Sequence, residues 1–142
     1  MSRYGKITSK RHGQNMRKHS WICLQCQTKS RVKVKICSVC ESKEIQYFPS
    51  DGEAKRYLQL KLFERAGKIT NLKIQPEYQI TLINGEKPFK YRADFRYIDT
   101  GTGKEVVEDV KGTTDERYFD DVFKLKRKAV EMQYGIKIVV VK

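Results

Sequence analysis

Four cysteines in the first third of this 142-residue chain constrain its fold more than any other feature. They form two Cys-x-x-Cys pairs, Cys23 with Cys26 and Cys37 with Cys40. Each pair offers two thiolates from a tight turn, and four thiolates suit tetrahedral Zn²⁺. A segment this short cannot hold a core alone, so the metal would supply its folding energy. The spacing predicts one structural zinc ion in a module over residues 21–48, with RVKVKI (31–36) as a short strand between the pairs.

The competing interpretations are a redox-active Cys-x-x-Cys motif and cysteines that are grouped by chance. Such motifs usually occur singly beside a βαβ unit, so the duplication favours metal. The initial segment MSRYGKITSKRHG lacks the apolar stretch of a secretory signal, which predicts a cytoplasmic protein whose thiols stay reduced. No apolar run approaches the roughly 20 residues of a membrane helix, so no membrane partner is expected.

The net charge of +13 is concentrated near the start of the chain. Residues 1–50 hold 11 Lys and Arg against 2 Asp and Glu, whereas residues 51–142 hold 19 against 15. A basic, acid-poor segment favours a polyanionic partner such as DNA, because lysine and arginine release the counterions of phosphates. A solvated tail that only aids solubility is the alternative. Residues 1–20 are expected to form a flexible basic arm. Contacts with DNA are expected from Arg3, Lys6, Lys10, Arg11, Arg17, Lys18, Arg31, Lys33 and Lys35.

Residues 49–142 read as one α/β domain. A first helix is predicted from the stripe Ala54, Leu58, Leu62 and Ala66, closed by Gly67. A second is predicted over 115–134 from the stripe Tyr118, Val122, Leu125, Ala129 and Met132, closed by Gly135. Strands are predicted at 72–83, where Pro76 either interrupts the strand or marks it as an edge strand, and at 90–99, 104–112 and 136–142. The resulting αβββαβ order predicts a mixed sheet, since the last crossover through a helix implies a parallel pairing.

The hairpin around TGTG (100–103) brings charged residues together. A symmetric turn would place Asp99 opposite Lys104 and therefore Asp94 opposite Asp109, with Lys111 on the same face. Two facing carboxylates call for a cation, and Mg²⁺ (or Mn²⁺) suits this demand. A one-residue slip would move Lys111 to the other face, and it is rejected because only Asp109 has a lysine two positions later. The register that places Asp94 opposite Asp109 also places Glu108 opposite Phe95. We expect Glu108 to be exposed near an edge of the sheet.

These residues resemble a known signature. Asp94, fourteen residues, and then Asp109-Val110-Lys111 resemble the D…(D/E)xK motif of the PD-(D/E)XK nuclease superfamily, with Ala93 in place of the proline. The αβββαβ order is similar to the restriction-endonuclease-like core of that superfamily. The runs YFPSDGEAKRYLQLKLFERAGKI, YRADFRYID, VVEDVKG and FKLKRK resemble a small family of phage-encoded nucleases. The resemblance implies that Asp94 and Asp109 bind the divalent metal, that Lys111 serves the hydrolytic water, and that Glu53 completes the site.

Two functions are compatible with this sequence. The first is a Mg²⁺-dependent DNA endonuclease that acts on double-stranded or branched DNA, such as a Holliday junction or a flap, in phage recombination or replication within the host cytoplasm. A homodimer would present two sites for symmetric cuts. The second is a non-catalytic zinc-ribbon protein that binds nucleic acid or a replication or transcription partner.

Three assignments keep an alternative. Glu53 follows Ser50 by three residues and could be part of a capping box. Asp94 could be an ordinary outward residue between Arg92 and Arg96, with Asp109 paired to one of those arginines. Lys124 and Lys128, one helical turn apart, could form a solvated face or contact DNA phosphates.

Overall fold

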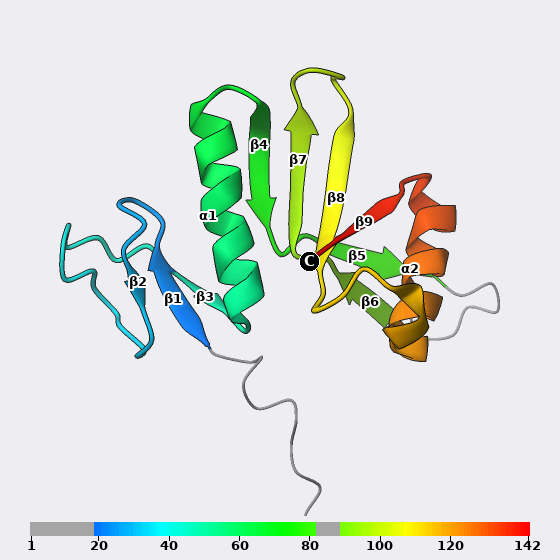
Figure 1. Ribbon diagram of the computed structural model, residues 1–142, viewed down its shortest axis with the longest axis horizontal. Coiled ribbons are helices and arrows are strands. Elements are labelled where there is room, and N and C mark those ends of the chain that lie inside the picture. Colours follow the sequence, from blue (N-terminus) through cyan, green and yellow to red (C-terminus); the bar gives the residue numbers. More distant parts are fainter. Residues whose placement is uncertain (1–18, 82–88) are drawn as a thin grey trace, which may run out of the picture. The chain divides into compact units, whose positions relative to one another are not determined.

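The computed structural model describes residues 19–81 and 89–142, and they form two compact units that divide between Asp51 and Gly52 (Figure 1). Most of the predicted basic arm lies outside the described residues, including its six arginines and lysines. Strand β1 begins at Ser20, the last residue assigned to that arm. Among the described residues, no helix has the length and apolar character needed to cross a membrane.

The N-terminal unit is a small antiparallel sheet in the order β2-β1-β3. Its strands are β1 (Ser20–Cys23), β2 (Lys29–Ser30) and β3 (Ile45–Phe48). Ile22 and Phe48 are fully buried on one face of this sheet. The predicted RVKVKI strand is wrong, because the Ser30 hydroxyl bonds both the N–H and the carbonyl of Val32 and turns the chain out of the sheet. Val32 is then 72% exposed.

The C-terminal unit is built on a four-stranded sheet in the order β4-β7-β8-β9. These strands are β4 (Ile69–Ile74), β7 (Phe95–Asp99), β8 (Glu105–Val110) and β9 (Ile138–Val141). Strand β9 pairs parallel to β8, which confirms the parallel pairing predicted for the last crossover. The other two pairings are antiparallel.

Two predicted strands are each broken into two. The segment 72–83 becomes the end of β4 and the separate β5 (Glu77–Ile80), and its last two residues lie outside the described part. The segment 90–99 becomes β6 (Phe89–Arg92) and β7, and β5 pairs with β6 as a two-stranded sheet. Both breaks lie side by side, joined by bonds from Gln75 N to Asp94 O and from Ala93 N to Pro76 O. Gln75 has a left-handed backbone (φ 52°), and this turn ends β4.

Helix α1 (Asp51–Arg65) packs through a different face from the one predicted. Its buried residues are Ala54, Tyr57 and Leu60, while Leu62 is 60% exposed. The Tyr57 ring stacks against Phe95 of β7, so the side of the helix that carries Tyr57 packs against the sheet. Gly67 ends the helix as predicted: its φ is +72°, and bonds from Lys68 N to Phe63 O and from Gly67 N to Glu64 O close the turn.

Helix α2 (Asp121–Tyr134) follows a short 3₁₀ turn, η1 (Glu116–Tyr118), and is capped by the Asp120 carboxylate and by left-handed Gly135. The predicted buried stripe is wrong for this helix. Val122, Leu125 and Met132 are at least 60% exposed, and Phe123 and Val130 are buried instead. These two belong to a core that spans both sheets of the unit, namely Tyr78, Ile80, Tyr91, Ala93, Val107, Phe119, Phe123, Val130 and Ile138. The predicted mixed α/β class with a four-cysteine cluster near its start is confirmed.

Candidate functional site

The hairpin register predicted from the TGTG turn is confirmed. Asp99 N donates to Lys104 O, and the paired residues run from Ile98 with Glu105 to Phe95 with Glu108. The Asp99 carboxylate accepts the N–H groups of two turn residues, Gly101 and Thr102, and so fixes this geometry.

Asp94 leaves the ladder one residue before it would face Asp109. Its N–H donates to Glu108 O at 3.0 Å, although Glu108 is already the partner of Phe95. Asp94 and Phe95 therefore both face Glu108, as in a β-bulge. Such bulges change the direction of side chains and often occur next to functional sites. The Asp94 carboxylate turns toward the end of β8, where Oδ2 accepts Val110 N at 2.6 Å. The predicted direct Asp94–Asp109 pairing is thus replaced by a bulge that keeps both acids at the same end of β8.

The electrostatics of Asp94 show that the predicted acids influence one another. Burial, followed by the nearby charges of Asp109 and Glu53, raises the pKa of Asp94 to about 8. The Val110 N–H and the Lys111 ammonium oppose this shift without cancelling it. Burial and anionic neighbours both disfavour the ionised form of Asp94, and a bound cation would favour that form instead.

Lys111 lies on the same side as Asp109, as the sequence predicts. Its Nζ is 3.1 Å from Asp109 Oδ1 and 4.0 Å from the ring centroid of Phe123 on α2. The carboxylate and the ring face both attract the ammonium, so they hold it in place. Its side chain remains 35% exposed, whereas that of Asp109 is 6% exposed. The lysine can therefore reach both the carboxylate and solvent.

Sequence reasoning missed Tyr91, which orients Asp109. The Tyr91 hydroxyl donates to Asp109 Oδ2 at 2.5 Å, and the residue is buried at the end of β6. Burial and then the charge of Asp109 raise the pKa of Tyr91, so the hydroxyl keeps its proton and remains a donor. The only signal in the sequence is its position three residues before Asp94, which alone does not distinguish it from a core tyrosine.

Glu108 is not exposed near an edge, which corrects the expectation for this residue. Strand β8 lies inside the sheet, and Glu108 is 2% exposed. Arg56 of α1 donates two hydrogen bonds to its carboxylate, from Nε to Oε2 at 2.8 Å and from Nη2 to Oε1 at 2.5 Å. The Tyr97 hydroxyl donates a third. A buried carboxylate with an arginine fork and a hydroxyl donor is fully paired. It lies on the face that α1 covers, opposite to that of Asp109.

The four cysteines form a compact cluster in the N-terminal unit. Their sulfurs all lie within 4.8 Å of one another, and the Cys23–Cys40 and Cys26–Cys37 separations are 3.5 and 3.4 Å. None is in a disulfide. A tetrahedron with metal–sulfur bonds of about 2.3 Å has sulfur–sulfur edges of about 3.8 Å. The cluster is therefore compatible with a structural metal ion such as zinc.

The two Cys-x-x-Cys turns have the same backbone design. Each pair is followed by a left-handed residue, Gln27 or Glu41, whose N–H donates to the carbonyl of the first cysteine of its pair. Backbone N–H groups point at the sulfurs: those of Cys40 and Val39 lower the pKa of Cys37 to about 6. The N–H of Cys26 is the largest of the effects that lower the pKa of Cys23. Both shifts favour thiolates, the form that binds metal.

The acids of the C-terminal unit are less tightly gathered. Within residues 19–81 and 89–142, the four cysteines are the one group of three or more potential metal ligands with all ligand atoms inside 4.8 Å. Glu53, Asp94 and Asp109 do not form such a group. They would share an ion only if water completed part of its coordination, which is how Mg²⁺ usually binds.

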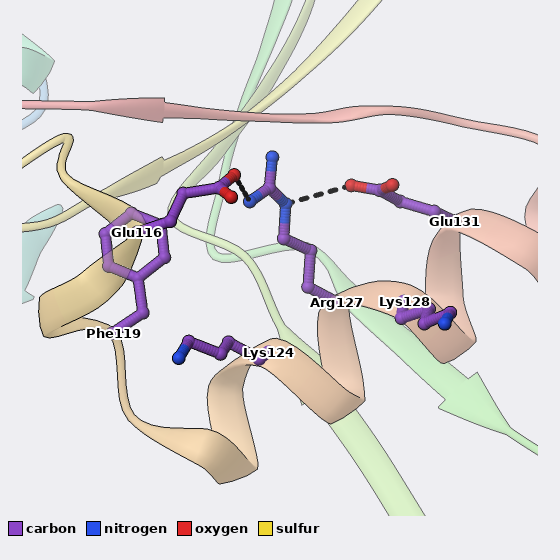
Figure 2. A pocket seen from close by; sticks show the side chains of 6 residues that line it. All are labelled: Glu116, Phe119, Lys124, Arg127, Lys128 and Glu131. Atoms are coloured by element: carbon purple, nitrogen blue, oxygen red, sulfur yellow. Dashed lines mark hydrogen bonds and ion pairs between the residues drawn. The ribbon is translucent and has the colours of Figure 1, made fainter.

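A hollow of about 380 Å³ on α2 is lined in part by Lys124 and Lys128, the two helix lysines for which the sequence leaves a solvated face and contact with DNA both open (Figure 2). Between them, Arg127 is bound to Glu116 and Glu131 and to the carbonyl of Ile138. Arg127 thus braces the helix against η1 and β9, while the two lysines line the hollow.

Some basic residues of the N-terminal unit form ion pairs, and others are accessible to solvent. Lys29 and Arg31 pair with Asp51 at 2.5 and 3.1 Å. Lys33 lines a second hollow, beside Trp21 and Tyr47, and Lys35 is exposed.

These features define a two-unit α/β protein with a metal-compatible Cys₄ cluster and with two acids beside a lysine, the half-buried Asp94 and the buried Asp109. Residues 33–141 match the family described as "Protein of unknown function (DUF1064)", and the chain belongs to this family. The match includes the second cysteine pair and nearly all of the C-terminal unit. No curated protein and no solved structure matches the chain.

Proposed function

We propose that this protein is a metal-dependent DNA endonuclease with a restriction-endonuclease-like core of the PD-(D/E)XK type. One observation carries the proposal: the Asp94 carboxylate accepts Val110 N at the end of β8, near enough to Asp109 for the two acids to interact electrostatically, and Lys111 lies 3.1 Å from Asp109. Two acids and a lysine at one end of a hairpin are the groups that phosphodiester hydrolysis requires. The element order helix, strands, helix, strand in the C-terminal unit also supports this core.

Asp94 and Asp109 would hold a Mg²⁺ or Mn²⁺ ion, with Glu53 reaching it directly or through water. When bound, the ion supplies Lewis-acid activation of the phosphate and of a coordinated water. The raised pKa of Asp94 fits this assignment, because a divalent cation would relieve the repulsion among its anionic neighbours.

Each remaining residue has a role that follows from its contacts. Lys111 would orient the attacking water or stabilise the charge that develops on the phosphate oxygens. Tyr91 holds the Asp109 carboxylate in one orientation through its hydroxyl. In the reaction, the water oxygen bonds to phosphorus, the bond from phosphorus to the leaving sugar oxygen breaks, and the water protons end on the leaving oxygen and in solvent.

The N-terminal unit and the lysines of α2 would bind the substrate. Zinc in the Cys₄ cluster would act structurally, since four cysteine ligands leave no position for a substrate. Lys124 and Lys128 line a hollow on α2 where phosphates would fit. Branched DNA, such as a Holliday junction or a flap, is the proposed target.

The experiment compares Asp109→Asn with the matched control Asp121→Asn, an exposed acid in the same unit. Labelled linear, single-stranded, flap and four-way DNA are incubated with Mg²⁺ or Mn²⁺, and binding is measured separately without divalent ions. Asp109→Asn should lose cleavage by at least about 100-fold yet bind DNA as well as or better than the natural chain, because a repelling carboxylate is removed. Asp121→Asn should cut normally. Equal cleavage by Asp109→Asn and the natural chain would contradict the catalytic role, and binding without any cleavage would favour a non-catalytic nucleic-acid-binding protein.

A further inference from the structure

Three aromatic rings gather on one side of the N-terminal sheet. Trp21 of β1 and Tyr47 of β3 are cross-strand partners, with ring centroids 5.4 Å apart. The ring of His19 stacks on Tyr47 at 5.5 Å and 21°, and its Nδ1 is hydrogen-bonded to the Tyr47 hydroxyl. These contacts fix the three rings relative to one another.

The rings are additional to the core of this small unit. Ile22 and Phe48, both fully buried, alternate with Trp21 and Tyr47 along their strands and therefore occupy the other face of the sheet. Tyr47 remains 39% exposed. Large aromatic side chains left accessible beside a hollow usually mark a binding surface.

The hollow beside the rings has a volume of about 470 Å³ and is lined by His19, Trp21, Lys33 and Tyr47. This size lies within the range of small-ligand sites. Its lining restricts the ligand. Ring faces favour a flat π-system, and the Lys33 ammonium disfavours a cation and attracts an anion. A nucleotide carries both matching parts, a flat base and a phosphate.

The base must be unpaired to use such a surface. In a duplex, both faces of each base are covered by their neighbours, whereas a single strand can turn a base outward onto aromatic rings. We infer that Trp21, Tyr47 and His19 form a stacking platform for an unpaired base of a DNA strand, with Lys33 contacting the adjacent phosphate. The inference rests on DNA as the substrate proposed above, and it assigns to the N-terminal unit the recognition of single-stranded segments at branches.

Trp21 is the single tryptophan of the chain, so its fluorescence reports directly on the platform. The full-length Asp109→Asn protein is titrated with oligothymidylate and with a hairpin duplex of equal phosphate number, without divalent ions. The single strand should quench the fluorescence, and the duplex should not. In the same protein, Tyr47→Ala should weaken single-strand binding about tenfold, since the stacking of one base on the ring is lost. Tyr47→Phe should retain most of the affinity.

Lys33→Ala is compared with Lys43→Ala, which removes the same charge from an exposed position in the same unit. Lys33→Ala should weaken single-strand binding and reduce its salt dependence more than the control does. Zinc content and far-UV circular dichroism verify that each variant is folded. Quenching by duplex as strong as by single strand, a stronger response to oligouridylate than to oligothymidylate, or equal losses on both DNAs in Tyr47→Ala would overturn the inference. Quenching by single strands in a protein that cuts no substrate would leave the platform intact and refute only the nuclease.

Discussion

Tyr91 donates a hydrogen bond of 2.5 Å to Asp109 Oδ2, and Lys111 lies 3.1 Å from the other oxygen of the same carboxylate. A buried acid is thereby oriented from both sides, by a neutral donor on β6 and by an ammonium beyond β8. This orientation is what distinguishes Asp109 from an ordinary buried charge.

Removal of the Tyr91 hydroxyl should therefore affect the site more than the fold. We expect Tyr91→Phe to lower the free energy of unfolding by about 1–2 kcal/mol, because the phenyl ring still fills the core. Cleavage or Mg²⁺ affinity should fall about 10- to 100-fold, as is usual for groups that orient a metal ligand. Denaturant unfolding and cleavage assays over a range of Mg²⁺ concentrations measure both effects. Unchanged activity would show that Asp109 needs no such orientation.

The Arg56–Glu108 pair should be important for stability instead. Arg56→Met leaves the Glu108 carboxylate buried with the Tyr97 hydroxyl as its remaining donor and should cost about 3–5 kcal/mol. The double variant Arg56→Met, Glu108→Leu should recover more than half of this loss, since no charge is then left unpaired. Urea unfolding of the two single variants and the double variant gives the coupling energy. Additive losses would mean that the two side chains do not depend on each other.

Stability without added divalent ions should fall as the pH rises. The pKa of Asp94 is about 8 in the folded protein, against about 3.9 in an unfolded chain. Between these values the folded state keeps a proton that the unfolded state releases, so the contribution of Asp94 is present near pH 4 and is lost by pH 8. Asp94→Asn should remove this part of the pH dependence and be more stable than the natural chain by several kcal/mol at pH 8. Urea unfolding at pH 5 and pH 8 tests the difference, and parallel curves for the two proteins would refute it.

Metal removal should unfold only the N-terminal unit. Metal analysis should give about one zinc per chain. A strong chelator should then raise amide hydrogen exchange across residues 20–48 and leave β7 and β8 protected, because the C-terminal unit has its own core. Cys26→Ser should reproduce this pattern without a chelator. Protection of residues 20–48 that survives complete loss of metal would mean that the small core around Ile22 and Phe48 suffices.

The sequence predicted the structure best where the spacing of nearby residues allows only one arrangement. The cysteine spacing predicts the Cys₄ cluster, and the TGTG turn predicts the register from Ile98 to Phe95, because a turn and a period of two determine which residues pair. The bulge at Asp94 escaped this reasoning, since it depends on the neighbouring turn at Gln75 in another strand.

The buried sides of the two helices could not be predicted from the sequence, for a related reason. Both helices carry apolar residues on more than one side, so periodicity alone could not select the buried side. Tyr57 rather than Leu62 packs against Phe95, and Phe123 rather than Leu125 lies beneath Lys111. Likewise, the partner of Glu108 lies 52 residues away, at Arg56, and no local pattern connects them.

The paired breaks after β4 and before β7 separate β5 and β6 from the four-stranded sheet. Among the described strands, β5 and β6 pair only with each other and form a two-stranded arm. Two backbone hydrogen bonds join the breaks where this β5-β6 arm leaves the larger sheet. Residues added in register beyond Ile80 would lengthen the arm without moving the carboxylates at its base. A longer or shorter arm would therefore leave the arrangement of Asp94 and Asp109 unchanged.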